Sequence, residues 1–407
     1  MFEWRRAPSV AGPSRLWPPL LLLVTYYTLT TTAAETGGGC LVPSHWRGSW
    51  FQSGVRDVIS LTRNELSSKG ACVYSKGDKY VFKDKEQQCH RCVALSEKHP
   101  NILQYKETFC EPTHYFDELC AQIPADGLLF SLFRRDAPPV ACPFKGPLSF
   151  SYTRGGGQCR LPKSTIHSCT SDTRLLFKYQ ACPDVPNTES SVEEVQCLGH
   201  WKEGSTRYFV GYVTYRMSVT DEDKYRCFAW EKARPGETHL DYRMAMSGDA
   251  TCNGVFSAFD GSRTLEIRKE GSYPGCTFPD WVTAHHRWHA LDHGATYTLA
   301  HHNTTLRLHH NHNPRATATP PSGQGDGGSK AEASQVCTKE VNISPSKATL
   351  ITHYTSGCSS GYVCTILYRR DDHVIEMQIG KRAIQPEEAC NPHYFDSSTA
   401  THVTLTS

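Results

Sequence analysis

Two runs in the middle of the chain, Arg207-Tyr-Phe-Val-Gly-Tyr-Val-Thr-Tyr-Arg216 and Lys224-Tyr-Arg-Cys-Phe-Ala-Trp230, are dense in aromatic and β-branched residues. Such residues favour strands, and the Asp- and Glu-containing turn between the runs predicts a β-hairpin. The same arrangement recurs at 361–368 and 373–379 around a pair of aspartates. Shorter strand patterns occur at 57–61 and 79–82, whereas long helical periodicity is hard to find. The sequence therefore predicts a mainly β fold of antiparallel strands.

The chain has eighteen cysteines, and all of them follow residue 39. An even number of cysteines behind a hydrophobic leader is typical of an extracellular disulfide framework. Small domains bury too little surface to offset chain entropy comfortably, which is a physical reason to cross-link them. We expect every cysteine to form a disulfide: Cys40, Cys72, Cys89, Cys92, Cys110, Cys120, Cys142, Cys159, Cys169, Cys182, Cys197, Cys227, Cys252, Cys276, Cys337, Cys358, Cys364 and Cys390.

The leader has the three parts of a secretory signal peptide. Arginines at 5, 6 and 15 precede a short apolar run at 20–29, and Thr32-Ala-Ala34 supplies small residues for cleavage. We therefore expect a signal peptide at 1–34 and a secreted, extracellular product with no transmembrane span in the mature chain. Removing the leader takes away three Arg and one Glu, and the remaining basic and acidic residues balance. A neutral chain lacks the basic patch of a nucleic-acid-binding protein, so we expect no nucleic-acid partner.

Turn-rich stretches at 134–139, 183–191 and 271–275 divide the mature chain into four predicted modules. They are a Cys-rich β module at 35–125, a small four-Cys module at 140–185, a β module at 192–270 and a β module at 274–407. Each is predicted to be a small, disulfide-linked antiparallel β module, either barrel-like or a sandwich. The last contains a stretch near 301–336 that is rich in His, Gly and Pro, and we expect a disordered insertion there.

The first and last modules share their beginning and their end. One opens with Cys40-Leu-Val-Pro-Ser-His-Trp46 and the other with Cys276-Thr-Phe-Pro-Asp-Trp281. They close with Cys110-Glu-Pro-Thr-His-Tyr-Phe-Asp117 and Cys390-Asn-Pro-His-Tyr-Phe-Asp396. This shared order predicts an internal repeat, which the region from Cys197 to Cys252 echoes more weakly.

The repeat and the cysteine count also favour particular disulfides, although six cysteines alone already allow fifteen pairings. The ends of the repeat favour pairing Cys40 with Cys110 and Cys276 with Cys390. The cysteines in 197–252 and in 276–390 are odd in number. From this parity we expect a disulfide that links these two regions.

Two resemblances bear on the fold. Gly48-Ser-Trp50-Phe51 resembles the opening of calycin-type barrels, in which a Trp seals the end of the barrel. The motif from Cys40 to Gly54, with Asp249-Ala-Thr-Cys252 and Cys390-Asn-Pro-His-Tyr-Phe395, resembles a family of uncharacterised cysteine-rich ectodomains of arthropods and related invertebrates. Members of that family are strings of consecutive domains of unknown function, secreted or anchored by a C-terminal span. The resemblance implies an architecture but no reaction and no ligand.

Few residue patterns point to catalysis. Cys89-His-Arg-Cys92 has the spacing of a thiol oxidoreductase, but nothing around it predicts the βαβ unit that carries such motifs, and structural disulfides explain it more simply. His114 and His393 hold equivalent positions in the repeat, where they either face a ligand or cap a turn while the neighbouring Tyr and Phe fill a core. No motif of a hydrolase, zinc protease or phosphate-binding loop occurs, so we expect neither enzyme activity nor a cofactor.

The histidine-rich stretch and two sequons are the remaining candidate sites. His301, His302, His309, His310 and His312 are weak candidates for zinc or copper ligands, and a solvated flexible loop is the alternative. Asn303 and Asn342 begin Asn-x-Ser/Thr sequons, so each is a candidate glycosylation site.

These observations leave three functions open. The first is a non-enzymatic extracellular protein that binds another extracellular protein or a glycan. The second is a small-ligand carrier of calycin-like type, which would require hollow barrels. The third is a secreted thiol oxidoreductase that uses Cys89 and Cys92.

Overall fold

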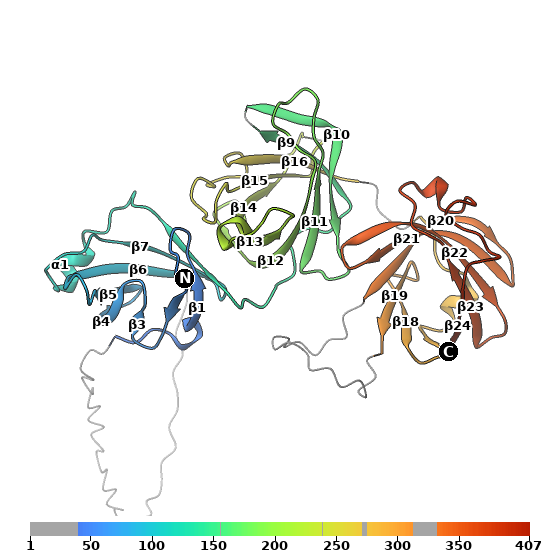
Figure 1. Ribbon diagram of the computed structural model, residues 1–407, viewed down its shortest axis with the longest axis horizontal. Helices are drawn as coiled ribbons and strands as arrows, with labels where there is room; N and C mark the ends of the chain where they lie inside the picture. The colour runs from blue at the N-terminus through green and yellow to red at the C-terminus, as the bar shows by residue number, and fades with distance from the viewer. Residues whose placement is uncertain (1–39, 155, 238, 271–274, 312–331) are drawn as a thin grey trace, which may run out of the picture. The chain divides into compact units, whose positions relative to one another are not determined.

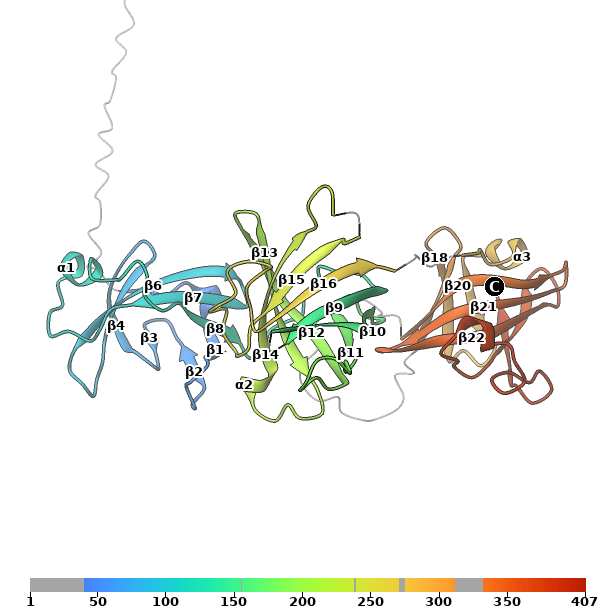
Figure 2. The ribbon, with the colours of Figure 1, turned by 90° about the horizontal axis from the view of Figure 1, so that it is seen from above.

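The computed structural model describes residues 40–154, 156–237, 239–270, 275–311 and 332–407, and the predicted signal peptide at 1–34 lies outside these ranges. In the described residues the strands close into three antiparallel barrels of eight strands each. Figures 1 and 2 show each barrel as strands curled on themselves, the first blue, the second green to yellow and the third orange to red. The predicted antiparallel β class is confirmed, and the modules are barrels rather than sandwiches.

The first barrel places its strands in chain order around the wall, and β1 pairs with β8 to close it. Its elements are η1 (Ser44–Trp46), β1 (Gly48–Phe51), β2 (Ile59–Leu61), β3 (Glu65–Leu66), β4 (Gly70–Lys76), β5 (Lys79–Lys83), β6 (His90–His99), β7 (Ile102–Glu107), α1 (Phe116–Cys120) and β8 (Phe130–Arg134).

The middle barrel closes where β9 pairs with β16. Its elements are β9 (Leu148–Arg154), β10 (Gly157–Ser168), β11 (Arg174–Tyr179), β12 (Ser191–Glu203), β13 (Thr206–Thr214), α2 (Asp221–Lys224), β14 (Tyr225–Lys232), β15 (Tyr242–Met246) and β16 (Arg263–Lys269). The predicted hairpin at 207–230 is confirmed as β13 and β14.

The third barrel closes where β17 pairs with β24. Its elements are α3 (Asp280–Thr283), β17 (Arg287–Ala290), β18 (Ala295–Ala300), β19 (Thr305–His310), β20 (Ala333–Ile343), β21 (Lys347–Ser356), β22 (Ser359–Arg369), β23 (Val374–Ile379), η2 (Pro386–Glu388) and β24 (His402–Thr406). The second predicted hairpin is confirmed as β22 and β23. None of the helices in the described ranges is long and apolar enough to cross a membrane.

The number of barrels differs from the predicted number of modules. Residues 140–185 and 192–270 form one barrel, because β11 and β12 pair over six residues across the turn-rich stretch 183–191. That stretch is a loop at one end of the barrel and not a boundary between domains. The disordered insertion was predicted near 301–336, but residues 305–310 and 333–343 within or beside that range form strands that pair with each other. The central residues 312–331 lie outside the described ranges.

A buried tryptophan on the first strand closes the interior of the first and third barrels. Trp50 and Trp288 are both 0% exposed. Trp50 Nε1 donates to the Trp46 carbonyl at 2.9 Å, and Trp288 Nε1 donates to the Val282 carbonyl at 3.0 Å. In both barrels the acceptor lies in the short helix before the first strand. The sequence repeat therefore marks the first segments of two barrels. Trp288 holds the position in the third barrel that Trp50 holds in the first, an equivalence that the sequence motif did not show.

Two disulfides recur at equivalent places in all three barrels. The cysteine that opens each barrel bonds to the fourth strand, in Cys40–Cys72, Cys142–Cys197 and Cys276–Cys337. The sixth strand of each barrel bonds to a segment 25 to 28 residues further on, in Cys92–Cys120, Cys227–Cys252 and Cys364–Cys390. The middle barrel thus shares the frame fully, with its opening at Cys142 instead of Cys197.

Three further disulfides complete the pairing, and no described cysteine is free. Cys89–Cys110 and Cys159–Cys182 lie within the first and middle barrels, whereas Cys169–Cys358 joins the middle barrel to the third. Beside that bond, Thr170 N donates to the Gly357 carbonyl at 2.9 Å.

The predicted Cys40–Cys110 and Cys276–Cys390 bonds are wrong, because each opening cysteine lies against the fourth strand of its own barrel. The predicted bond between regions 197–252 and 276–390 is also wrong. Each of these odd groups instead bonds to the cysteines at 142–182.

Candidate functional site

A pocket opens at one end of the middle barrel, where the charged residues of its inner face gather. On β9 the inner row runs Leu148, Phe150 and Tyr152, all in the core, and the next inward position is Arg154. On β16 the inward core residues Leu265 and Ile267 follow Arg263, so an arginine again lies next to the core at this end of the barrel. The aromatic interior of this barrel is thus capped by a layer of arginines.

The neighbouring strands extend this charged layer. On β12 the core residues Val195 and Cys197 follow Glu193, and on β14 the core residue Phe228 follows Arg226. Three arginines and one glutamate therefore occupy inward positions, where barrels of this size are normally filled by uncharged side chains. This charged layer, Arg154, Glu193, Arg226 and Arg263, is the candidate site.

Arg263 is the most enclosed of these arginines. Its Nη1 lies 3.6 Å from Glu193 Oε1, and the two side chains are only 17% and 14% exposed. Its guanidinium carbon lies 4.3 Å from the centre of the Tyr179 ring, a cation–π distance. Burial acts to lower the pKa of Arg263, but the nearby Tyr179 and Glu193 together raise it. Arg263 therefore stays charged although it lies in the barrel.

Glu193 only partly neutralises this arginine. Burial raises the pKa of Glu193, while the charge of Arg263 acts against that rise. The 3.6 Å separation is too long for a hydrogen bond, and Arg263 Nη1 is buried without a hydrogen-bond partner among the described residues. A buried donor without an acceptor costs free energy.

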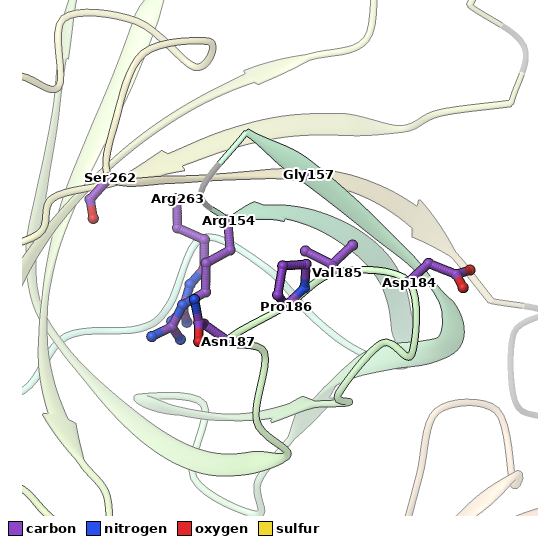
Figure 3. A pocket seen from close by; sticks show the side chains of 8 residues that line it. All are labelled: Arg154, Gly157, Asp184, Val185, Pro186, Asn187, Ser262 and Arg263. Carbon is purple, nitrogen blue, oxygen red and sulfur yellow. The ribbon is translucent and has the colours of Figure 1, made fainter.

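Arg154 and Arg263 line one pocket of about 540 Å³ together with Asn187, Asp184, Val185 and Ser262 among others. Figure 3 shows both arginine side chains extending in the same direction, toward Asn187, while Asp184 points away from them. Within the described ranges Arg154 has neither an ion pair nor a hydrogen bond to another side chain, so its guanidinium donors are available to a ligand. Asn187 adopts a left-handed backbone conformation with φ of 60°, which places its side chain at this turn.

A second pocket, of about 650 Å³, adjoins the first and shares Arg154, Ser262 and Arg263 with it. Arg226 and Asp223 lie on its wall, but both make local contacts. Arg226 Nη1 donates to the carbonyls of Glu222 and Tyr225 at 2.7 Å. Asp223 accepts from the backbone nitrogen of Thr220 at 3.0 Å, which closes the capping box of α2 and lowers the pKa of Asp223.

None of the candidate site residues predicted from the sequence lines these pockets, although the strand runs 207–216 and 224–230 and the turn-rich stretch 183–191 contribute to their walls. The signal for them was the apolar row Leu148, Phe150 and Tyr152, which alternates along β9 and then continues into Arg154. Such an arginine can be assigned to the charged end of a barrel only when the bounds of the strand are known, together with which of its side chains point into the barrel.

The other candidate residues are placed elsewhere. Cys89 and Cys92 bond to different cysteines, Cys110 and Cys120, instead of to each other as in a dithiol redox motif. His114 and His393 are both exposed. Asp396 caps the turn after the second of them, accepting from the Ser398 backbone nitrogen at 2.9 Å.

The histidine tract is split by strand β19. His301 and His302 lie at the turn before the strand, whereas His309 and His310 lie at its far end; His312 lies outside the described residues. A strand of six residues separates its ends by roughly 17 Å, too far for one metal ion to bind both pairs. The described residues hold no group of three or more His, Cys, Asp or Glu side chains that could hold a metal ion.

The two sequons differ in exposure. Asn342 lies on an exposed part of β20. Asn303 lies in the turn before β19, where its carbonyl accepts from the Phe278 backbone nitrogen at 3.0 Å and the sequon residue Thr305 is only 6% exposed.

Comparison with protein families divides the chain as the barrels do. Residues 38–124 match a Domain of unknown function (DUF7044), residues 138–269 match a Domain of unknown function (DUF7042), and residues 272–404 match a Domain of unknown function (DUF7043). The chain belongs to this tandem-domain family. No curated protein and no solved structure matches the chain. Each matched range falls on a different barrel, although the DUF7044 range ends before β8, and the charged layer belongs to the DUF7042 barrel.

Proposed function

We propose that this chain is a secreted, non-enzymatic extracellular protein that binds another extracellular protein or a glycan at the open end of its DUF7042 barrel. The observation that carries the proposal is the pair of adjoining pockets above the charged layer. A concave surface with a few convergent polar groups is the usual form of a binding site.

The disulfides support an extracellular location. The described chain holds nine of them, and such density is typical of proteins that fold in an oxidising compartment. In the DUF7042 barrel the repeated pair of disulfides anchors β12 and β14, which contribute residues to the second pocket. A rigid frame lowers the entropy cost of binding, because little of the site must be ordered when the ligand arrives.

Packing within the barrel gives less support to a carrier that encloses an apolar ligand. Phe209 and Phe228 stack in the middle of the DUF7042 barrel with ring centroids 4.3 Å apart, and both are essentially unexposed. Phe144 packs edge-on against Phe209 from the opposite end of the barrel. These side chains fill the space that an enclosed ligand would need.

The test is to block the pockets of the secreted full-length chain and measure binding to arrays of extracellular proteins and glycans. Ser262 is exposed and lines both pockets, so Ser262→Trp fills them without disturbing the core. Ser205 is exposed in the β12–β13 turn at the opposite end of the same barrel, and Ser205→Trp is the matched control. We expect array partners that survive Ser205→Trp and are lost with Ser262→Trp. Partners that bind both variants equally would contradict the proposed site.

A further inference from the structure

The charged layer of the DUF7042 barrel leaves guanidinium donors facing one pocket. Arg154 has no hydrogen bond or ion pair to another side chain in the described part of the chain, and Arg263 lines the same pocket although its Nη1 is buried. Asp184, the acidic residue of that pocket, points away from both arginines (Figure 3). Glu193 pairs with Arg263 only, so the two converging guanidinium groups keep an excess of positive charge, which suits an anion.

The remaining lining shows what else the ligand must offer. More than half of the residues around the two pockets are polar or charged, whereas sites for apolar molecules are lined mainly by hydrophobic side chains. Hydroxyl groups come from Ser190 and Ser191, and carboxylate acceptors from Glu189 and Glu193. A ligand that fits such a lining carries several hydroxyl groups as well as its negative charge.

One aromatic ring completes the site. Tyr215 lines the second pocket and is partly buried directly after the end of β13. An aromatic ring beside several hydrogen-bonding groups provides an apolar surface against which the face of a sugar ring can pack.

We propose that the pockets bind an acidic saccharide, with a carboxylate or sulfate group held between Arg154 and Arg263 beside the Asn187 amide. The sugar hydroxyls face the serine and glutamate side chains of the adjoining pocket. This inference rests on the proposed function and names the class of ligand for that same site. Carboxylate and sulfate present similar oxygen acceptors to a guanidinium group, so the experiment includes both.

Isothermal titration of the full secreted chain tests this assignment with five probes. They are a disaccharide of glucuronic acid and N-acetylglucosamine, lactose 3′-sulfate, uncharged lactose, sodium sulfate and oleate. Lactose and its sulfate differ only in the acidic group. We expect at least one acidic disaccharide to bind at least about tenfold more tightly than lactose, since charge-assisted hydrogen bonds are stronger than neutral ones.

Variants then locate the binding. Arg154→Gln should weaken the acidic disaccharide at least about tenfold, because it removes the charge and keeps hydrogen-bonding ability. Arg160→Gln is the control, since Arg160 is exposed on the same barrel and lies outside both pockets. It should change the affinity less than about twofold. Arg154 is exposed and makes no side-chain hydrogen bond or ion pair in the described ranges, so we expect its substitution to leave the fold intact.

Other outcomes overturn the assignment. If neither acidic disaccharide binds more tightly than lactose, or if Arg154→Gln and Arg160→Gln weaken binding equally, the assignment of an acidic group to this site is wrong. Binding of oleate alone would identify an apolar anion, and binding of sulfate alone a simple anion site. If no disaccharide binds while Ser262→Trp still abolishes an array partner, the proposed function stands and the saccharide assignment fails.

Discussion

A disulfide joins the sixth strand of each barrel to a later segment. The same bond can therefore be removed in each of the three barrels in turn. The pairs are Cys92–Cys120, Cys227–Cys252 and Cys364–Cys390, and their sequence separations are 28, 25 and 26 residues. Their strand cysteines are all 0% or 1% exposed. Replacing both cysteines of one pair by alanine removes the cross-link from one barrel and leaves the other two as internal controls.

The expected cost follows from the length of the closed loop. For loops of this size, the loss of chain entropy in the unfolded state makes each bond worth about 3.5 kcal/mol at 25 °C. Because the term depends on the logarithm of loop length, the three values should agree to within about 0.1 kcal/mol. The small cavity left by each sulfur pair adds a similar loss in each barrel.

Hydrogen exchange with mass spectrometry measures this change barrel by barrel, because β6, β14 and β22 belong to different barrels. We expect the opening free energy of the altered barrel to fall by roughly 3 to 4 kcal/mol and that of the other two to fall by less. A loss below about 1 kcal/mol, or losses that differ by more than about 2 kcal/mol between barrels, would refute loop entropy as the main term.

Three further predictions concern single residues. Arg134 lies 4.4 Å from the Trp50 ring centre and donates to three backbone carbonyls, so Arg134→Ala should cost roughly 2 to 4 kcal/mol in a denaturant melt followed by tryptophan fluorescence. Burial lowers the pKa of both His167 and His353 to about 4, so the unfolded chain takes up protons that the folded chain does not, and stability should fall as the pH drops from about 6.5 toward 4. Denaturant midpoints at several pH values check this, and His353→Gln should reduce the slope. The exposed Asn342 should carry a glycan, so Asn342→Gln should remove a glycosidase-sensitive shift in gel mobility.

The sequence predicted those features that depend on neighbouring residues. Aromatic and β-branched runs marked the hairpins of β13 with β14 and β22 with β23, because strand propensity and turn chemistry act locally. The leading Cys and Trp of the first and third barrels were also visible, since each motif lies within a few residues of chain. These local signals were enough to predict an antiparallel β protein made of repeated modules.

Features that depend on closure of the barrels could not be predicted in this way. Cys40 bonds to Cys72 because the opening segment lies against the fourth strand, a neighbourhood set by barrel closure. The loop at 183–191 resembled a linker because composition alone does not show that β11 and β12 pair across it. The charged layer was missed for the same reason, since Arg154 and Arg263 lie 109 positions apart in the chain and meet only when β9 pairs with β16.

The Cys169–Cys358 bond makes a covalent ring of the chain between these two residues. Extracellular proteases cut exposed loops, and a single cut inside a ring separates no part of the molecule. One nick between residues 169 and 358 therefore converts the protein into two polypeptides that migrate together until the bond is reduced. The DUF7042 and DUF7043 barrels accordingly remain one molecule after a cleavage that would release a domain from a linear chain.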